Sequence, residues 1–102
     1  MKEIKAIIQP FMLEPVMNAL HEIKDLPAVT ISTAHGVSVE RGAHDQVMKT
    51  KLEIMVPDER VEQLIEVIQK AARTGKAGDG RIFVLPVEET VKIRTGERGA
   101  WR

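Results

Sequence analysis

The chain has 102 residues, and its 15 basic and 15 acidic side chains give a formal net charge of zero at pH 7, so nucleic acid or an anionic membrane would not attract it as a whole. Apolar residues make up 43% of the chain and aromatic residues only 3%, which predicts one domain with an aliphatic core. The absence of cysteine excludes disulfides and thiol catalysis, and without a long apolar run or leader pattern we expect a soluble, cytoplasmic protein.

The first half of the chain predicts a strand, a helix and a second strand. Residues 4–8 are rich in β-branched side chains and are followed by Pro10, which predicts a strand that ends there. Apolar residues then recur at three- and four-residue spacing over 13–23, which predicts an amphipathic helix that ends near residues 25–27. Residues 29–34 alternate with period two, as in a half-buried strand.

The second half predicts the same order of elements. A polar, glycine-containing loop over 36–48 leads into a strand at 51–56. Asp58 is placed to cap a helix with an apolar stripe over 61–72, and Gly75 is expected to stop it. Residues 81–86 predict a fourth strand, and residues 91–94 a short fifth one.

These two strand and helix units form a weak internal repeat, which predicts a ferredoxin-like βαββαβ sandwich of class α+β: one antiparallel sheet with two helices on one face. The other face would expose an apolar set. Burial of this set against sister subunits is the expected outcome, and the alternative is that the fifth strand and the tail fold over it. The set consists of Ile7, Met55, Phe83 and Leu85.

The segment from Arg73 to Phe83 contains three glycines in six positions, with Lys76 and Arg81 beside them. Such a turn can point several N–H groups into one concavity, which suits phosphate oxygens. The alternative interpretation is a helix C-cap followed by a turn into the fourth strand. Cations at Lys92, Arg94 and Arg98 add positive charge to the same part of the chain, although they also fit a solvated strand edge.

Three motifs resemble the PII signal transduction family: TGKAGDGRIFV at 74–84, IRTGE at 93–97 and AIIQPF at 6–11. The resemblance covers nearly the whole chain outside the connecting loop. It implies a single PII-like domain over 1–102, with a mobile loop at about 37–49 and a short C-terminal tail at about 95–102. It further implies a homotrimer, and a protein that is not an enzyme but binds ATP or ADP between subunits and regulates a partner protein, such as a membrane transporter.

The resemblance also assigns nucleotide-binding positions. One subunit would line the nucleotide with Ile7, Gly36, Val37 and Met55, and would supply the phosphate loop with Gly78, Asp79, Gly80 and Arg81. The neighbouring subunit would contribute Thr30, Lys92 and Arg94. The two cations would meet the phosphates as charge-assisted donors, and Lys92 stands where the family more often has arginine, so it lacks bidentate geometry.

The loop departs from the family pattern. It is shortened to residues 43–48 between Gly42 and Lys49, and the chain has no tyrosine, which excludes control by uridylylation of a loop tyrosine. Glu40 stands where the family has a glutamine that helps to hold magnesium and 2-oxoglutarate, which argues against 2-oxoglutarate as an effector.

Several alternatives stay open. His35, His44, Asp45 and Glu40 could bind a divalent metal, although solvated loop residues are the simpler interpretation. The chain could therefore be a divalent-cation or bicarbonate-linked PII-like regulator of a transporter, or a CutA-like metal-tolerance trimer. A small hydrolase on the same fold is a third class, but no nucleophile and base pair is evident. Trp101 could anchor the tail or meet a partner.

Overall fold

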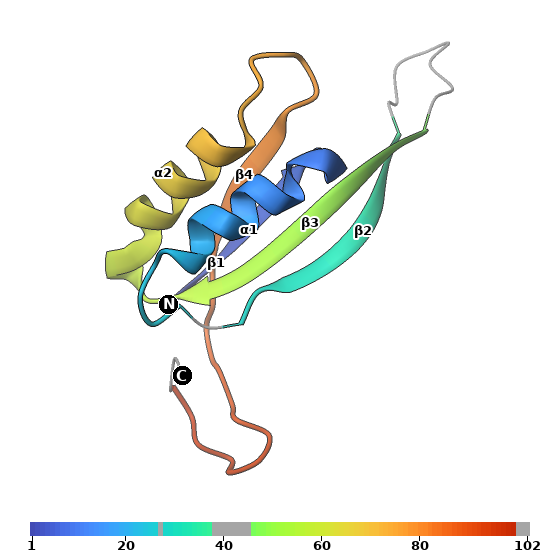
Figure 1. Ribbon diagram of the computed structural model, residues 1–102. Coiled ribbons are helices and arrows are strands. Elements are labelled where there is room, and N and C mark those ends of the chain that lie inside the picture. The colour runs from blue at the N-terminus through green and yellow to red at the C-terminus, as the bar shows by residue number, and fades with distance from the viewer. Residues whose placement is uncertain (27, 38–45, 100–102) are drawn as a thin grey trace.

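The computed structural model describes residues 1–26, 28–37 and 46–99. Four strands form one antiparallel sheet in the order β2-β3-β1-β4, and both long helices cover the same face of it (Figure 1). The predicted ferredoxin-like α+β sandwich is therefore confirmed. The elements in chain order are β1 (Lys2–Ile8), η1 (Pro10–Met12), α1 (Leu13–His21), β2 (Thr30–Val37), β3 (Gln46–Val56), η2 (Asp58–Arg60), α2 (Val61–Ala72) and β4 (Gly80–Pro86).

The core lies between the sheet and the helices. Period-two alternation turns every second side chain of the two central strands toward the helices, and the helix residues that meet them recur at helical spacing. The fully buried aliphatic side chains are Ile4, Ile8, Val16, Leu20, Leu52, Ile54, Val56, Leu64 and Ile68. Leu64 and Ile68, from the stripe that the sequence predicted for α2, are among them, and the predicted bounds of 61–72 agree with the helix.

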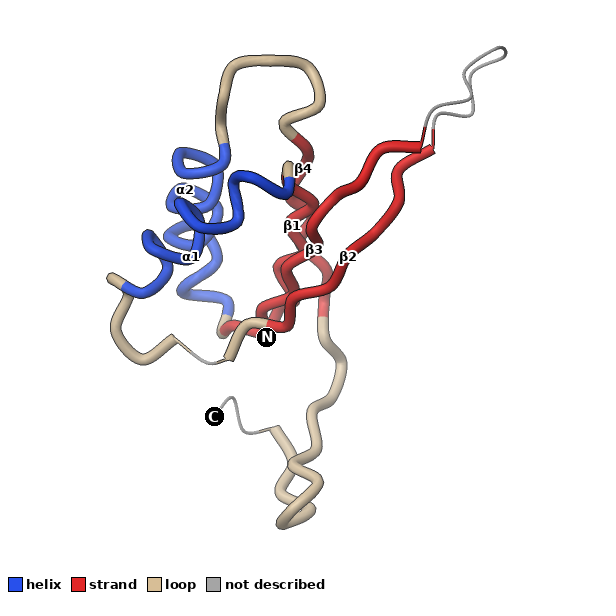
Figure 2. The backbone as a smooth tube through the Cα atoms, turned by 45° about the vertical axis from the view of Figure 1, so that its right-hand side comes forward, coloured by secondary structure: helices blue, strands red, loops and turns tan. Residues whose placement is uncertain are grey.

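The hairpin of β2 and β3 is longer than predicted. Gly36 and Val37 belong to β2, and residues 46–49 belong to β3, so this part of the predicted loop is strand. The β2–β3 register continues to Val37 opposite Gln46, whereas β1 ends at Ile8 opposite Thr50. Four residues at the strand rise of about 3.3 Å per residue correspond to about 13 Å. Figure 2 shows β2 and β3 extending past the end of β1. The middle of the predicted loop, 38–45, lies outside the described residues.

Three further expectations were wrong in detail. The first helix ends at His21 rather than near residues 25–27. Asp58 does not cap α2: its carboxylate lies 2.9 Å from the N-terminal ammonium of Met1 and 3.8 Å from Nζ of Lys2, and the pKa of Asp58 is lowered mainly by the hydrogen bond from that ammonium. No fifth strand forms over 91–94, where only an isolated bridge joins Val91 to Arg98.

The sheet face away from the helices, the open face, is covered by no described element. Cross-strand partners share a face, so the register places Ile7, Met55, Phe83 and Leu85 together on it, as predicted. The open face is not uniformly apolar, however, because a charged row crosses its centre. This row consists of Glu3, Lys5, Lys51 and Glu53, with ion pairs of 3.5 Å between Lys5 and Glu3 and 3.9 Å between Lys51 and Glu53.

Candidate functional site

The glycine turn, residues 73–80, connects the end of α2 to the start of β4. Gly78 has a φ of +93° and Gly80 a φ of +104°, values that L side chains rarely adopt. A Cβ atom at Gly80 would lie 1.8 Å from the carbonyl oxygen of Ile7. Glycine at position 80 therefore allows β4 to begin directly beside β1, and this contact fixes the turn against the sheet.

The carboxylate of Asp79 holds the turn together from inside. Its Oδ2 accepts hydrogen bonds from the backbone N–H groups of Thr74 at 2.8 Å and Gly75 at 2.9 Å. Its Oδ1 accepts from the Thr74 hydroxyl and, at 2.8 Å, from Nε2 of Gln9 at the end of β1. The hydrogen bond from the Thr74 hydroxyl is the main cause that lowers the pKa of Asp79 to about 2, so this side chain is anionic at neutral pH.

The predicted concavity of N–H groups is therefore partly filled by the protein's own carboxylate. The N–H groups of Thr74 and Gly75 bind Asp79, and the N–H of Lys76 donates to the Thr74 hydroxyl at 3.3 Å. Among the described residues, no hydrogen bond is recorded for the N–H groups of 77–79. These later N–H groups are the ones that an external anion could use.

Lys49 joins the turn to the hairpin. Its Nζ donates to the carbonyl oxygen of Gly78 at 2.5 Å, and its side chain also passes 3.9 Å from where a Cβ of Gly36 would lie. The sequence does not predict this contact, because its polar pattern places Lys49 in the loop. Period-two alternation with Lys51 and Glu53, extended by one step, would have put Lys49 on the same strand face.

The structure brings together most of the residues that were predicted to line the nucleotide from one subunit. They lie at one end of the sheet, the turn end, where β1 and β2 finish and β4 begins. The glycine turn lies beside this end and the hairpin extends from it (Figure 1). The residues gathered there are Ile7, Gly36, Gly78, Asp79, Gly80 and Arg81. Val37 also lies at this end, but strand alternation turns its side chain to the face opposite Gly36.

Met55 does not join this group. It pairs with Glu3 near the start of β1, four residues from Ile7 along the strand, which is a separation of about 13 Å. Thr30, at the start of β2, pairs with Glu53 and lies toward the same end as Met55. Within one protomer, Met55 therefore lies away from Ile7 and Gly36, with which it was predicted to line the nucleotide, and toward Thr30.

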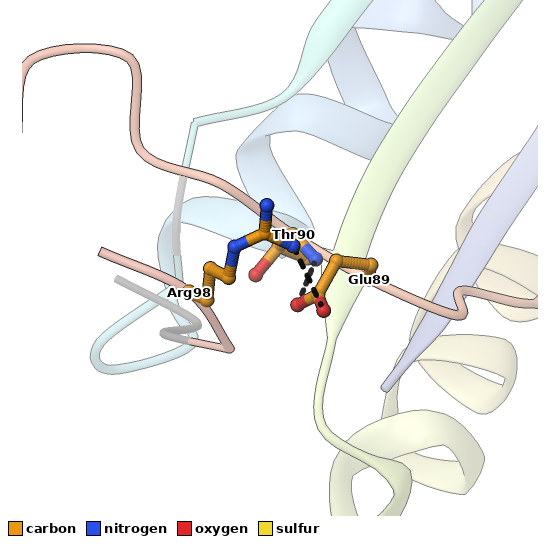
Figure 3. Close-up of polar contacts among 3 residues, drawn as sticks. All are labelled: Glu89, Thr90 and Arg98. Carbon is orange, nitrogen blue, oxygen red and sulfur yellow. Dashed lines mark hydrogen bonds and ion pairs between the residues drawn. The ribbon is translucent and has the colours of Figure 1, made fainter. Parts of the chain in front are cut away.

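The C-terminal arm, residues 87–99, leaves this second end of the sheet and projects away from the body (Figures 1 and 2). It doubles back on itself: the N–H of Lys92 donates to the carbonyl oxygen of Glu97 at 2.9 Å. At its base, Arg98 lies 3.4 Å from the carboxylate of Glu89, which also accepts from the N–H of Thr90 at 3.2 Å (Figure 3). Ile93, at the outer part of the arm, is fully exposed.

The cations of the arm lie far from the glycine turn of the same chain. The seven residues of β4 separate the turn from Val87, which corresponds to roughly 20 Å. Nζ of Lys92 is 3.9 Å from the carboxylate of Glu97, while Arg94 is exposed. Within one protomer, the two predicted halves of the nucleotide site are therefore at opposite ends of the sheet.

An open cavity of about 470 Å³ lies between α2 and β4. Aliphatic side chains form much of its lining, together with Arg73 at the start of the glycine turn and Arg81 directly after it. The lining residues are Ile8, Ile65, Ile68, Gln69, Ala72, Arg73, Asp79, Gly80, Arg81 and Ile82. Asp79, Gly80 and Arg81 thus border this cavity as well as the turn.

The described residues contain no group of three His, Asp or Glu side chains that could hold a metal ion. His35 is exposed on β2, and the other loop residues considered for metal binding, Glu40, His44 and Asp45, lie outside the described part of the chain, as does Trp101. Within 1–26, 28–37 and 46–99, no helix is long and apolar enough to cross a membrane.

Comparison with known proteins gives one family. Residues 1–97 match the family model described as nitrogen regulatory protein P-II. The chain is 48% identical over 109 residues to the nitrogen regulatory protein P-II of Azospirillum brasilense, with 97% of this chain and 96% of the relative covered. The protein of the same name from Rhodospirillum rubrum is also 48% identical, over the same length and with the same coverage.

A solved structure shares the fold as well as the sequence. The chain superposes on the crystal structure of Arabidopsis thaliana PII bound to citrate with a TM-score of 0.84 and 42% identity. The match covers 96% of this chain and 87% of the plant chain. On the near full-length match in sequence and in structure, the chain belongs to the nitrogen regulatory protein P-II family.

Proposed function

We propose that this chain is a cytoplasmic signalling protein, rather than an enzyme, that assembles as a homotrimer. Each cleft between subunits would bind ATP or ADP, and the nucleotide would control how the protein binds a regulated partner, such as a membrane transporter. Membership of the P-II family supports a regulatory role in general. The finer statements rest on the geometry of the two ends of the sheet.

The observation that carries the proposal is the separation of the two site halves within one protomer. The glycine turn with Arg81 lies at one end of β4, and the arm with Lys92 and Arg94 follows the other end. An arm that reaches the turn of the next copy would complete a site, and repetition of this head-to-tail contact closes a ring. A trimer built in this way has one site at each subunit boundary.

The proposed site suits a polyphosphate. The N–H groups of 77–79 can donate to phosphate oxygens, and Arg81 can add charge-assisted hydrogen bonds from the same subunit. Lys92 and Arg94 of the next subunit would neutralise the remaining charge, at the cost of the weak contact between Lys92 and Glu97. Ile7, Gly36 and the backbone of Val37 would line the nucleoside, with Met55 and Thr30 coming from the neighbouring subunit.

The open face gives the trimer a surface to bury. Phe83 is 42% exposed there. Contact with sister subunits would cover this aromatic ring. The charged row would then lie inside the assembly, where paired charges favour one register of subunits.

Regulation through the hairpin follows from the link that Lys49 makes between the turn and β3. A nucleotide that binds at the turn can shift the hairpin between two positions only if its affinity for the protein differs between those two positions. The proposal that the loop between β2 and β3 is shorter than in relatives has one support: the alignment with the Azospirillum protein spans 109 positions, more than the 102 residues of the chain. A different loop would suit a different partner.

Calorimetric titration tests the nucleotide proposal directly. We expect saturable binding of ATP and of ADP, and weakening by about tenfold or more when Arg94 is replaced by alanine, because a charge-assisted hydrogen bond to phosphate contributes about 1.5–3 kcal/mol. Glu62→Ala, on the exposed side of α2, serves as the control. Citrate, the ligand of the Arabidopsis relative, should be included as a competing anion. Absence of binding by both nucleotides would contradict the proposal.

Mixing two variants that each bind nucleotide weakly tests whether the site is shared between subunits. Arg81→Ala removes a cation from the turn half, and Arg94→Ala removes one from the arm half. If each site combines the turn of one subunit with the arm of the next, every mixed trimer has one cleft with both halves intact. Subunit exchange between the two variants should therefore restore a fraction of tight ADP binding. Sites contained within single subunits would show no recovery.

A further inference from the structure

We infer that Gln9 and Thr74 are positioning residues that, through Asp79, hold the glycine turn in the shape that receives phosphate. This inference rests on the proposed function, because it concerns the same turn. Neither side chain was among the predicted nucleotide-binding residues. The geometry points to them because both donate to the one carboxylate that organises the turn.

The turn needs hydrogen bonds that fix its shape, because its glycines give the backbone many accessible conformations. Gly75, Gly78 and Gly80 all adopt positive φ within six residues, and glycine loses more conformational freedom on ordering than any other residue. Fixing each residue of the turn in one conformation costs conformational entropy. A turn ordered only by the ligand would subtract that cost from the binding free energy, whereas a turn ordered beforehand would not.

Gln9, Thr74, Gly75 and Asp79 form a hydrogen-bonded clamp that connects three elements. Gln9 follows β1, Thr74 and Gly75 follow α2, and Asp79 precedes β4. All four hydrogen bonds converge on the two oxygens of Asp79. The carboxylate is thus engaged on both oxygens by the protein itself, and its backbone, rather than its side chain, remains for the ligand.

The negative charge of Asp79 allows the positioning role to be distinguished from a purely electrostatic one. A carboxylate inside an anion-binding turn repels phosphate, so a purely electrostatic account predicts that its removal strengthens nucleotide binding. The positioning account predicts the reverse, because loss of the clamp frees the three glycines. The two accounts therefore differ in sign for Asp79→Asn, which removes the charge and weakens the clamp together: the electrostatic account predicts tighter ADP binding and the positioning account weaker ADP binding.

The test uses pairs of variants in the full-length protein. Thr74→Val removes the hydroxyl donor, and Thr74→Ser keeps it; Gln9→Met removes the amide donor, and Gln9→Lys keeps a donor of similar length. Calorimetry gives the affinity for ADP, and titration followed by NMR gives the affinity for adenosine, which lacks phosphate. Thermal unfolding confirms that each variant is folded at the temperature of the assay.

We expect Thr74→Val and Gln9→Met to weaken ADP binding by about tenfold, the loss for one hydrogen bond of about 1.4 kcal/mol. The donor-keeping variants should stay within about threefold of wild type, and adenosine affinity should not change. Unchanged or stronger ADP binding by both donor-lacking variants would overturn the inference alone. An equal loss of adenosine and ADP would also overturn it, since that is the signature of general structural damage. A wild-type protein that binds no ADP would overturn the proposed function and this inference together.

If Thr74→Val does not fold, hydrogen exchange of the Gln9→Met variant provides the second measurement. The amides of Thr74 and Gly75 should be protected in wild type without nucleotide and should exchange faster in Gln9→Met, while the amides of β1 keep their protection. Equal protection of Thr74 and Gly75 in both proteins would contradict a role of Gln9 in the clamp.

Discussion

Asp79 is the residue on which the local order of the turn depends. Its folded-state pKa is about 2, below the ordinary value of 3.8. A lowered pKa means that the ionised form is stabilised by folding, so its contribution is present above about pH 4 and is lost as the pH falls toward 2. The four donors that cause this shift all come from the clamp.

The first prediction concerns Asp79→Asn. The variant should be less stable than wild type at pH 7, and the difference should shrink as the pH falls from about 4 to 2, because wild type then loses the same ionised carboxylate. Urea unfolding at a series of pH values measures this. Glu62→Gln, on the exposed side of α2 and outside the clamp, is the control. A difference that stays constant down to pH 2 would contradict the prediction.

The second prediction concerns Gly80→Ala. The added Cβ would lie 1.8 Å from the carbonyl oxygen of Ile7, so the strand pair must separate locally. Gly78→Ala is the matched control: it has a similar positive φ but meets only the end of the Lys49 side chain at 3.8 Å. The control should cost about 1–2 kcal/mol of backbone strain, and Gly80→Ala should cost clearly more in chemical denaturation. Equal costs would show that steric contact with Ile7 does not matter.

At the scale of the element, α2 connects the core to the site. Leu64 and Ile68 are fully buried against the sheet, while the end of the helix leads directly into Thr74 and the clamp. Packing of this helix therefore sets where the turn begins. The hairpin is the second element that reaches the turn, since Lys49 on β3 donates to the carbonyl oxygen of Gly78.

The third prediction concerns this packing. Leu64→Ala should lower the free energy of unfolding by about 2–5 kcal/mol, because it removes buried contacts and leaves a cavity. Glu62→Ala, two residues earlier on the exposed side of the same helix, should change it by less than about 0.5 kcal/mol. Urea unfolding measures both. A small effect of Leu64→Ala would mean that α2 packs on the sheet less closely than the structure describes.

At the scale of the whole molecule, one protomer leaves the open face and the outer part of the arm in solvent. Phe83 lies on the open face opposite Lys5, and Ile93 is fully exposed on the arm. Large apolar side chains gathered in this way are typical of surfaces that meet other chains. Both features fit the proposed trimer, in which the face and the arm contact neighbouring subunits.

The fourth prediction concerns assembly. Phe83→Lys places a second cation beside Lys5 and removes apolar area, so it should shift the protein from trimer toward monomer in sedimentation velocity. Gln63→Lys, on the exposed side of α2, adds the same charge away from the open face and should leave the trimer intact. A wild-type protein that sediments as a monomer would contradict the trimer proposal, and an intact Phe83→Lys trimer would show that the open face is not its interface.

The sequence by itself determined the fold class, because strand and helix periodicities are local: the alternation over 51–56 and the stripe over 61–72 each specify one buried face. It also identified the glycine turn and the family motifs, which are contiguous in the chain. The limits of β2 and β3 were wrong because the hairpin extends beyond the part where apolar alternation is visible, so only cross-strand pairing reveals it.

The tertiary structure alone decided which distant residues meet. Gln9 and Asp79 are 70 positions apart in the chain, and Lys49 and Gly78 are 29 apart, yet each pair is joined by a hydrogen bond because the antiparallel register aligns the ends of β1, β3 and β4. The same register separates Met55 from Ile7, which sequence reasoning had grouped. Such contacts depend on the order of strands in the sheet, and no local pattern of residues encodes that order at the atomic level.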